Sequence, residues 1–366
     1  MSKFRRIGAG FCGTVWAEPD DSSAFKREDG GPGRSLTNDF EMHKRVIQSL
    51  EQLHALKKNN ATIHETVTAN APPETSPTII TIPTCYRFIT PADTDWWDTN
   101  LIRFPEGYTP CNVIHAQRIP PISQPVREFL IDTYCPPSII AEIKASDTNR
   151  DCLIRPYLGR RRVLPTESSQ NGDNGGPSSR RPPRQRAFFS LRNFPLHIDQ
   201  MEQLGISYSD MEVYTRGMAD ALATMHFNAG IDANDVEFVL APPPPPHNTA
   251  LSSLSERDEY PVISNVLGTH MMWILDFDCC RDIAVDEEKG LEQVITAFLR
   301  NDPFYPRPSS SEDLWRVFRV RYIWTVQEIV RDRTDADKER LVTFAERFVK
   351  GVEEKEMEKM QRRVSS

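Results

Sequence analysis

Four residues near the start of the chain have the types and the spacing that suit phosphate binding. Gly8, Gly10, Gly13 and Val15 form the pattern G-x-G-x-x-G-x-V. Glycines at these positions lack the Cβ atoms that would keep a backbone away from phosphate oxygens. An ordinary β-hairpin can have the same spacing, so the flanking residues must distinguish the two possibilities.

The flanking residues favour a strand on each side of the glycines. Val15 and the residues after it have high β propensity, whereas a dinucleotide-binding fold needs a helix at this point. A second short apolar run, 22–26, ends in Lys26. Strand, glycine hairpin, strand and lysine is the order of a kinase glycine-rich loop and its phosphate-contacting lysine. A surface lysine on a plain hairpin is the alternative.

An expected helix after the lysine carries a candidate partner for it. Apolar residues between 40 and 56 repeat at helical spacing, and Thr37 or Asn38 could cap the helix. Glu41 would then lie in the first turn. There it could hold Lys26 in an ion pair, or it could simply complement the helix dipole.

Carboxylates in two later segments could supply a base and metal ligands. Asp232 or Asp235 could accept the proton of an attacking hydroxyl, and Glu237 follows five residues after Asp232. Asp276 lies near the end of an apolar strand expected at 271–278. Hard carboxylate oxygens suit Mg²⁺, which accompanies nucleoside triphosphates. Asp232 and Asp235 are also compatible with simple turn residues.

The overall composition is that of a soluble globular protein. The chain has 366 residues, of which 39% are hydrophobic and 26% are charged, and its formal net charge is −8. A negative net charge does not favour binding to nucleic acid, so no nucleic-acid partner is expected. No apolar run suits a membrane span, and the N-terminus does not look like a secretory signal. We therefore expect an intracellular protein, cytoplasmic or nuclear, without a membrane partner.

The cysteines do not have the spacing of a structural zinc site. No C-x-x-C pair occurs, and no pair of histidines has finger spacing, so no zinc is expected. A scattered, odd set fits buried or free thiols in a reducing compartment. The seven are Cys12, Cys85, Cys111, Cys135, Cys152, Cys279 and Cys280.

Composition also predicts how the chain is divided. We expect an N-terminal lobe at 1–122, with a sheet and one helix, and a helical C-terminal lobe at 123–366. A disordered insertion at 164–187 is rich in arginine, which suits a nuclear or nucleic-acid role or a solvated linker. A proline-rich loop at 241–261 could bind a partner domain or act as a spacer.

Local patterns predict the main elements. Strands are expected at 78–83, 85–89 and 112–119, with a turn at 93–98. A long amphipathic helix is expected at 209–227, and helices fill the chain after 291.

The order of these motifs resembles the protein-kinase-like fold, especially its aminoglycoside- and choline-kinase branch. The resemblance rests on the glycine pattern, Lys26 and Asp276-Phe277. It implies an α+β, bilobal protein with a small antiparallel-sheet N-lobe and a mainly helical C-lobe. The backbone of Gly8–Gly13 would cover the phosphates of ATP in the cleft between the lobes. Lys26, oriented by Glu41, would contact those phosphates.

The same resemblance assigns Mg²⁺ to Asp276 and Glu237, but the catalytic loop departs from the family. The chain has no His-Arg-Asp, and Glu237 stands where the family has asparagine. This combination favours a pseudokinase or degenerate kinase that acts as a binding or regulatory module and could have a protein partner. An active Mg-ATP-dependent phosphotransferase, with Asp232 or Asp235 as base, is one alternative. A nuclear nucleic-acid-associated regulator is another.

Two further segments resemble a fungal domain family of unknown function. They are 235–240 and the proline-containing segment 301–308. Members of that family often carry a zinc-finger label, which the cysteine spacing does not support.

Overall fold

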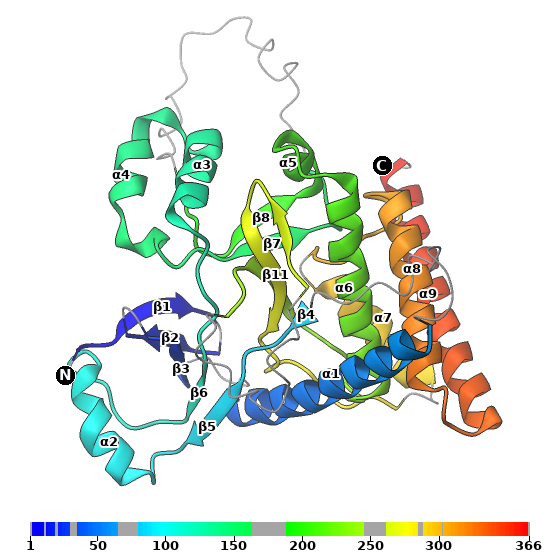
Figure 1. The fold of residues 1–366 in the computed structure, drawn as a ribbon, viewed down its shortest axis with the longest axis horizontal. Helices are drawn as coiled ribbons and strands as arrows, with labels where there is room; N and C mark the ends of the chain where they lie inside the picture. The colour runs from blue at the N-terminus through cyan, green and yellow to red at the C-terminus, as the bar shows by residue number, and fades with distance from the viewer. Residues whose placement is uncertain are drawn as a thin grey trace, which may run out of the picture.

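The computed structural model describes an α+β protein with an antiparallel sheet and helices (Figure 1). The described residues are 2–10, 12–18, 21–29, 35–64, 80–162, 188–244, 261–284, 288–301 and 303–364. The expected insertion at 164–187 and most of the expected proline-rich loop at 241–261 lie outside them. None of the described helices combines the length and apolarity that crossing a membrane requires.

The N-terminal sheet has five strands in the order β1-β2-β3-β6-β5, and every neighbouring pair is antiparallel. The predicted glycine hairpin joins β1 to β2, and the strand predicted at 85–89 is present as β5. The five strands are β1 (Arg5–Ala9), β2 (Thr14–Ala17), β3 (Ser23–Arg27), β5 (Cys85–Ile89) and β6 (Val113–Gln117).

The turn predicted at 93–98 is wrong, because the chain forms helix α2 (Thr94–Asn100) there. Trp97 is 3% exposed and donates from Nε1 to the carbonyl oxygen of Thr90 (2.8 Å). Its ring joins the aromatic core under the sheet, where the guanidinium of buried Arg27 lies 5.5 Å from the ring centroid. Burial of the tryptophan therefore outweighs the turn preference of the flanking acids.

A second sheet lies in the C-terminal part of the chain, which is less purely helical than expected. Its order is β10-β11-β9-β7-β8, and short β4 pairs with β11 in parallel. The strand β4 comes from the region expected to be the N-terminal lobe, so the division at residue 122 is not a clean one. The strands are β4 (Ile80–Thr81), β7 (Ile154–Tyr157), β8 (Phe194–His197), β9 (Glu237–Ala241), β10 (Ile263–Asn265) and β11 (Gly268–Leu275).

Most of the large core lies between this sheet and the C-terminal helices. In Figure 1, α6 stands beside β11, α8 and α9 lie on the far side of α6, and α1 runs from the N-terminal sheet toward these helices. The longer helices are α1 (Leu36–His64), α3 (Gln124–Tyr134), α6 (Tyr208–Phe227), α7 (Glu288–Arg300), α8 (Glu312–Ile329) and α9 (Asp335–Val364). Shorter helices are α4 (Ile140–Ala145) and α5 (Ile198–Gln203).

Candidate functional site

The glycine hairpin contains one glycine that the fold requires and one that it does not. Gly13 has φ +154°, and a Cβ there would lie 1.8 Å from the carbonyl oxygen of Arg27. A Cβ on Gly10 would meet no atom within 4 Å, although its backbone N–H donates to Gly13 O (2.9 Å). Gly8 packs against Val15, whose Cβ would lie 3.2 Å from an added Cβ. Packing therefore explains Gly13 and leaves the space beside Gly10 open.

Lys26, on β3, makes two ion pairs. Its Nζ lies 2.6 Å from Asp39 Oδ2 and 2.7 Å from Asp276 Oδ1. The side chains of Lys26, Asp39 and Asp276 are 20%, 3% and 30% exposed. Burial opposes the charge on Lys26, but the two carboxylates outweigh it and raise the pKa of Lys26 well above its ordinary value. The lysine is therefore a fixed cation at the edge of the site.

The prediction that Glu41 pairs with Lys26 is wrong, because Asp39 takes that place. Glu41 instead pairs with Lys44 (3.1 Å) on the exposed side of α1. Helix α1 begins at Leu36, before the predicted caps, which places Asp39 in its first turn. Residues two positions apart in a helix are separated by about 200° around its axis. Asp39 and Glu41 therefore face nearly opposite directions.

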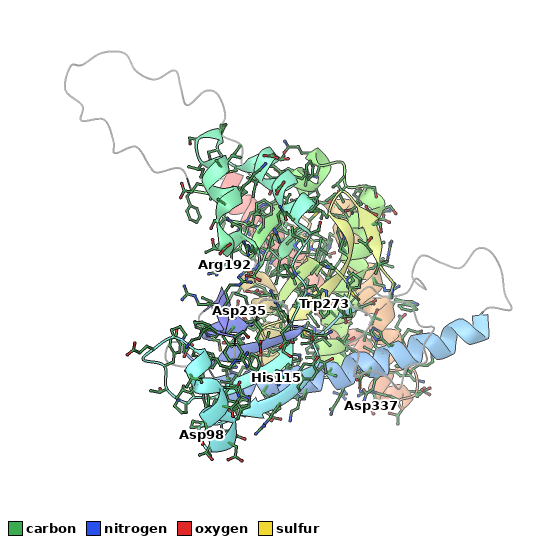
Figure 2. The ribbon with its side chains drawn as sticks, turned by 60° about the vertical axis from the view of Figure 1, so that its left-hand side comes forward. Asp98, His115, Arg192, Asp235, Trp273 and Asp337 are labelled. Carbon is green, nitrogen blue, oxygen red and sulfur yellow. The ribbon has the colours of Figure 1, made fainter. Side chains whose placement is uncertain are left out.

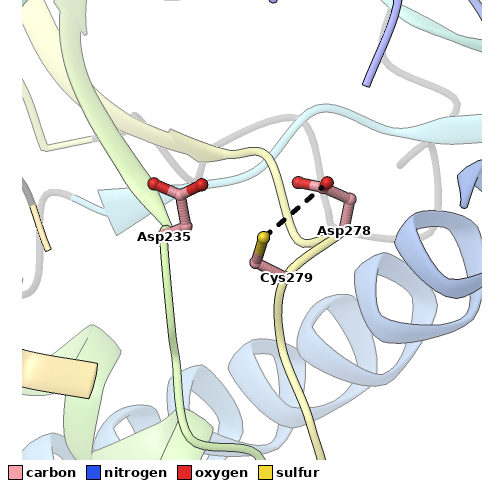
Figure 3. A group of neighbouring side chains, drawn as sticks. All are labelled: Asp235, Asp278 and Cys279. Atoms are coloured by element: carbon pink, nitrogen blue, oxygen red, sulfur yellow. Dashed lines mark hydrogen bonds between the residues drawn. The ribbon is translucent and has the colours of Figure 1, made fainter. Parts of the chain in front are cut away.

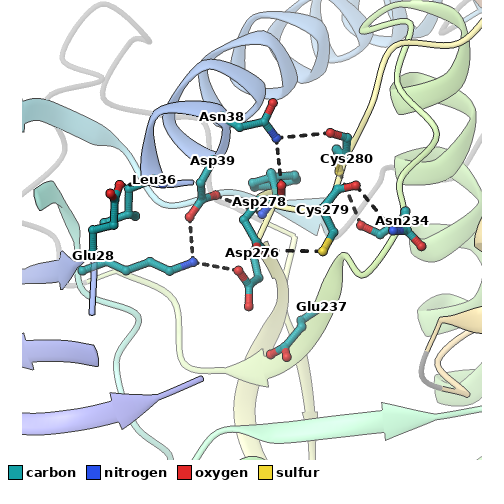
Figure 4. A network of polar contacts seen from close by, with 12 residues as sticks. Glu28, Leu36, Asn38, Asp39, Asn234, Glu237, Asp276, Asp278, Cys279 and Cys280 are labelled. Carbon is teal, nitrogen blue, oxygen red and sulfur yellow. Dashed lines mark hydrogen bonds and ion pairs between the residues drawn. The ribbon is translucent and has the colours of Figure 1, made fainter. Parts of the chain in front are cut away.

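Asp39 also fixes the segment that follows β11. Its Oδ1 accepts a hydrogen bond from the backbone N–H of Phe277 (3.0 Å). One residue earlier, Asn38 Nδ2 donates to the carbonyl oxygen of Asp278 (2.8 Å). The start of α1 thus holds β3 and the end of β11 together, as Figure 4 shows.

Asp276 lies in a constrained backbone conformation. Its φ is +68°, in the left-handed region that non-glycine residues seldom adopt. Such strain is more frequent at functional sites than elsewhere. The turn brings the carboxylate to Lys26 directly after β11.

Glu237, the other predicted metal ligand, lies close to Asp276. It is the cross-strand partner of Leu275, the residue that precedes Asp276. Figure 4 shows Asp276 directly after β11 and Glu237 at the start of β9. Glu237 also forms an ion pair with Arg155. The structure thus places both predicted metal ligands at the same end of the β9–β11 pair.

Asp232 is built into its own loop. It is 5% exposed, and its Oδ1 accepts from the backbone N–H groups of Asn234 (3.2 Å) and Arg281 (3.0 Å). Its Oδ2 accepts from Gln293 Nε2 (2.8 Å). These contacts are those of a structural turn residue, which was the alternative reading of the sequence.

Asp235 is exposed and also has a positive φ, +65°. Figure 2 shows it near the centre of the view, whereas Asp98 on α2 lies at the edge. Its carboxylate lies within 4.8 Å of donor atoms of Asp278 and Cys279 (Figure 3). Neither Asp278 nor Cys279 was predicted to be a site residue, although both directly follow Asp276-Phe277.

Cys12, in the glycine hairpin, is another residue that was not predicted to be part of the site. It is 3% exposed, and Asp278 and Lys26 are among the charged groups that act on its thiol. Burial is the main cause that raises the pKa of this thiol, with Lys26 acting in the opposite sense.

Arg161 and Arg162, beside the predicted basic insertion, have acidic partners. Arg161 contacts both carboxylate oxygens of Glu202 at 2.7 Å, and Arg162 Nε lies 2.8 Å from Asp199 Oδ2. Their charges are thus balanced within the protein, which weakens the case for a nucleic-acid surface here.

Comparisons with known proteins give one match. No curated protein and no solved structure matches the chain, so they lend no support to a kinase-like fold. The segment that matches, residues 272–334, has Cys279 and Cys280 as its cysteines and has no histidine. It therefore lacks the ligands of a zinc finger. Residues 272–334, which include Asp276 and the proline-containing segment 301–308, match a domain family of unknown function described as "Zinc finger protein".

Proposed function

We propose that the chain is a binding module for a magnesium nucleoside triphosphate, with the site formed by the glycine hairpin, Lys26 and Asp276. The observation that supports this most is the double ion pair of Lys26 with Asp39 and Asp276. A lysine on the third strand, an acid on the following helix and an aspartate after a late strand are the parts with which kinases hold ATP. No curated or solved relative adds to this argument.

Each part has a role that follows from its charge. The open space beside Gly10 lets phosphate oxygens approach backbone N–H groups. Lys26 would exchange its contact with Asp276 for one with the phosphates and would keep Asp39 as its anchor. Asp39 suits an anchor because its second oxygen is already held by the backbone of Phe277.

The residues present fit Mg²⁺. Asp276 and Glu237 offer hard carboxylate oxygens, and neither side chain is fully buried, at 30% and 20% exposed. The metal ion would neutralise phosphate charge beside them. Arg155, the partner of Glu237, keeps that carboxylate oriented.

A binding role is favoured over turnover because the first candidate base is occupied. Both oxygens of Asp232 already accept hydrogen bonds from the protein. A general base needs a free oxygen within reach of the acceptor hydroxyl. The module would therefore act through nucleotide-dependent contacts with another protein.

The exposure of Asp235 supports a second candidate function, phosphoryl transfer to a small or atypical acceptor. In that case Asp235 would take the hydroxyl proton. ATP hydrolysis or transfer that Asp235→Asn abolishes while ATP binding is retained would establish this function. Turnover that stays at the buffer rate in the wild type would exclude it.

Nucleotide binding can be tested by thermal unfolding with ATP and Mg²⁺. At a free ligand concentration of about 100 Kd, binding should stabilise the protein by about 2.7 kcal/mol. Lys26→Met should lose that ligand-dependent shift, measured against its own ligand-free midpoint. Lys44→Met is the matched control, because Lys44 lies on α1 but pairs with exposed Glu41. An equal shift in Lys26→Met would count against the proposed site.

A further inference from the structure

Arg155, on β7, is a second cation beside the carboxylates proposed to hold Mg²⁺. Its Nη2 forms the ion pair with Glu237, and the two side chains are 14% and 20% exposed. Glu237 is the cross-strand partner of Leu275, which precedes Asp276. Asp276 is paired with Lys26 in the same way, so each proposed metal ligand has a cation beside it.

The alternation of side chains along the strands explains why Arg155 meets Glu237. The residues on either side of Arg155, Ile154 and Pro156, are buried, and Ile154 belongs to the large core between the sheet and the helices. Arg155 therefore points to the opposite face of the sheet. Phe238 also belongs to that core, so Glu237 points to the opposite face as well. The ion pair thus lies across the adjacent strands β7 and β9, on the face turned away from the helices.

The charge of a bound triphosphate calls for more than one lysine. Lys26 keeps Asp39 as its anchor, so part of the lysine charge is already balanced. The charge of Mg²⁺ is balanced in part by the carboxylates of Asp276 and Glu237. A second protein cation at this place therefore supplies positive charge that the phosphates still need.

We propose that Arg155 is a second phosphate-binding residue, which contacts the triphosphate from the C-terminal sheet. This inference rests on the proposed nucleotide function. A guanidinium has several N–H donors in a planar fork that matches phosphate oxygens, so Arg155 can bind phosphate while its Nη2 stays with Glu237. The triphosphate is then held by one cation from each sheet, Lys26 from the N-terminal one and Arg155 from the other.

Three other roles for Arg155 would give different results. If it were a structural partner alone, its loss would lower stability without changing ligand affinity. If it only oriented Glu237, it would act through Mg²⁺, and an excess of Mg²⁺ would restore binding. If it competed with Mg²⁺ for Glu237, its removal would strengthen binding.

Calorimetric titration of the full chain with ATP and with inorganic tripolyphosphate, each with saturating Mg²⁺, tests the proposal. Arg155→Met should weaken both ligands by the same factor, at least about tenfold, and more Mg²⁺ should not restore binding. Arg155→Lys keeps the charge but not the fork, so it should recover part of the loss. Arg216→Met is the matched control and should bind like the wild type, because Arg216 is 15% exposed and pairs with Glu212 within α6.

The outcomes separate this proposal from the nucleotide site itself. Unchanged affinities in Arg155→Met, beside a loss of binding in Lys26→Met, would overturn the role of Arg155 and leave the nucleotide site standing. A loss that excess Mg²⁺ reverses, or tighter binding by Arg155→Met, would also overturn it. Absence of binding to the wild type would overturn both proposals. If thermal unfolding shows that Arg155→Met is not folded, Arg155→Lys decides, and an affinity equal to that of the wild type would count against the contact.

Discussion

The ammonium group of Lys26 lies 2.6 Å from the carboxylate of Asp39, and that carboxylate also holds the backbone of Phe277. One buried aspartate at the start of α1 therefore fixes both the lysine on β3 and the segment that carries Asp276. The geometry of the proposed site therefore depends on Asp39. Substitutions at Asp39 should consequently affect both stability and binding.

We predict that Asp39→Ala lowers the free energy of unfolding by about 2–3 kcal/mol, because it removes charged hydrogen bonds from a buried carboxylate. Glu41→Ala should change it by no more than about 0.5 kcal/mol, since its pair with Lys44 is exposed. Urea unfolding of the two variants measures the difference. Equal losses would show that Asp39 is not the anchor of the site.

Two glycine variants should separate folding from ligand binding. Gly13→Ala should destabilise the protein by about 1–3 kcal/mol, because its Cβ would collide with the Arg27 carbonyl and its φ is unfavourable. Gly10→Ala should leave stability within about 0.5 kcal/mol but weaken ATP binding, because its Cβ would enter the open space. Thermal unfolding and ATP titration report the two effects. A stable Gly13→Ala protein would contradict the hairpin geometry.

A buried ion pair between α6 and α8 should be a main determinant of stability. Arg321 Nε and Nη2 donate to the two oxygens of Asp220 (2.8 and 2.9 Å), and both side chains are at most 1% exposed. We predict that Asp220→Ala lowers the free energy of unfolding by about 3–5 kcal/mol, because it leaves a buried guanidinium without its counter-charge. Asp313→Ala, which removes an exposed pair with Arg316, should cost no more than about 1 kcal/mol. Chemical denaturation compares them, and similar costs would argue against this account.

His226 should make stability depend on pH. Burial lowers the pKa of His226 to about 3, and its Nδ1 lies 2.7 Å from the hydroxyl of Tyr322. In the unfolded chain the imidazole has its ordinary pKa near about 6.5 and binds a proton as the pH falls below that value. The unfolded state then binds more protons than the folded state, so stability falls between about pH 6.5 and about pH 3.

Urea unfolding at several pH values can isolate this contribution. One proton corresponds to at most about 1.4 kcal/mol for each pH unit in that window. His226→Gln should show a shallower slope than the wild type by up to that amount. Identical slopes would mean that His226 is not held neutral in the folded protein.

The sequence was informative where local residue types decide the structure. The glycine hairpin, β5 and the long helix at α6 follow from glycine spacing, strand propensity and helical periodicity, and they were predicted. The parallel pairing of β4 with β11 was not, because it joins segments far apart in the chain. Such pairing depends on tertiary burial, which a local pattern does not contain.

The difference between local patterns and tertiary contacts also explains which residues of the site were predicted. The resemblance implied that Lys26 and Asp276 belong to one nucleotide site, and their side chains form an ion pair in the structure. Asp39 was missed although it falls in the first turn whether the helix begins at Leu36 or after a cap at Thr37 or Asn38. The pattern placed two acids there, Asp39 and Glu41, and it does not show which of them faces β3. The start of the helix is set by Glu28, whose Oε2 accepts from the backbone N–H of Leu36 (3.1 Å).

The most direct test of the account is isothermal titration of the full chain with ATP in the presence and absence of Mg²⁺. We predict a single binding event that requires Mg²⁺ in the wild type and is weakened by at least about tenfold in Asp276→Asn, which keeps the size of the side chain but removes its charge. Absence of binding to the wild type, or equal binding by Asp276→Asn, would contradict a nucleotide site built on Lys26 and Asp276.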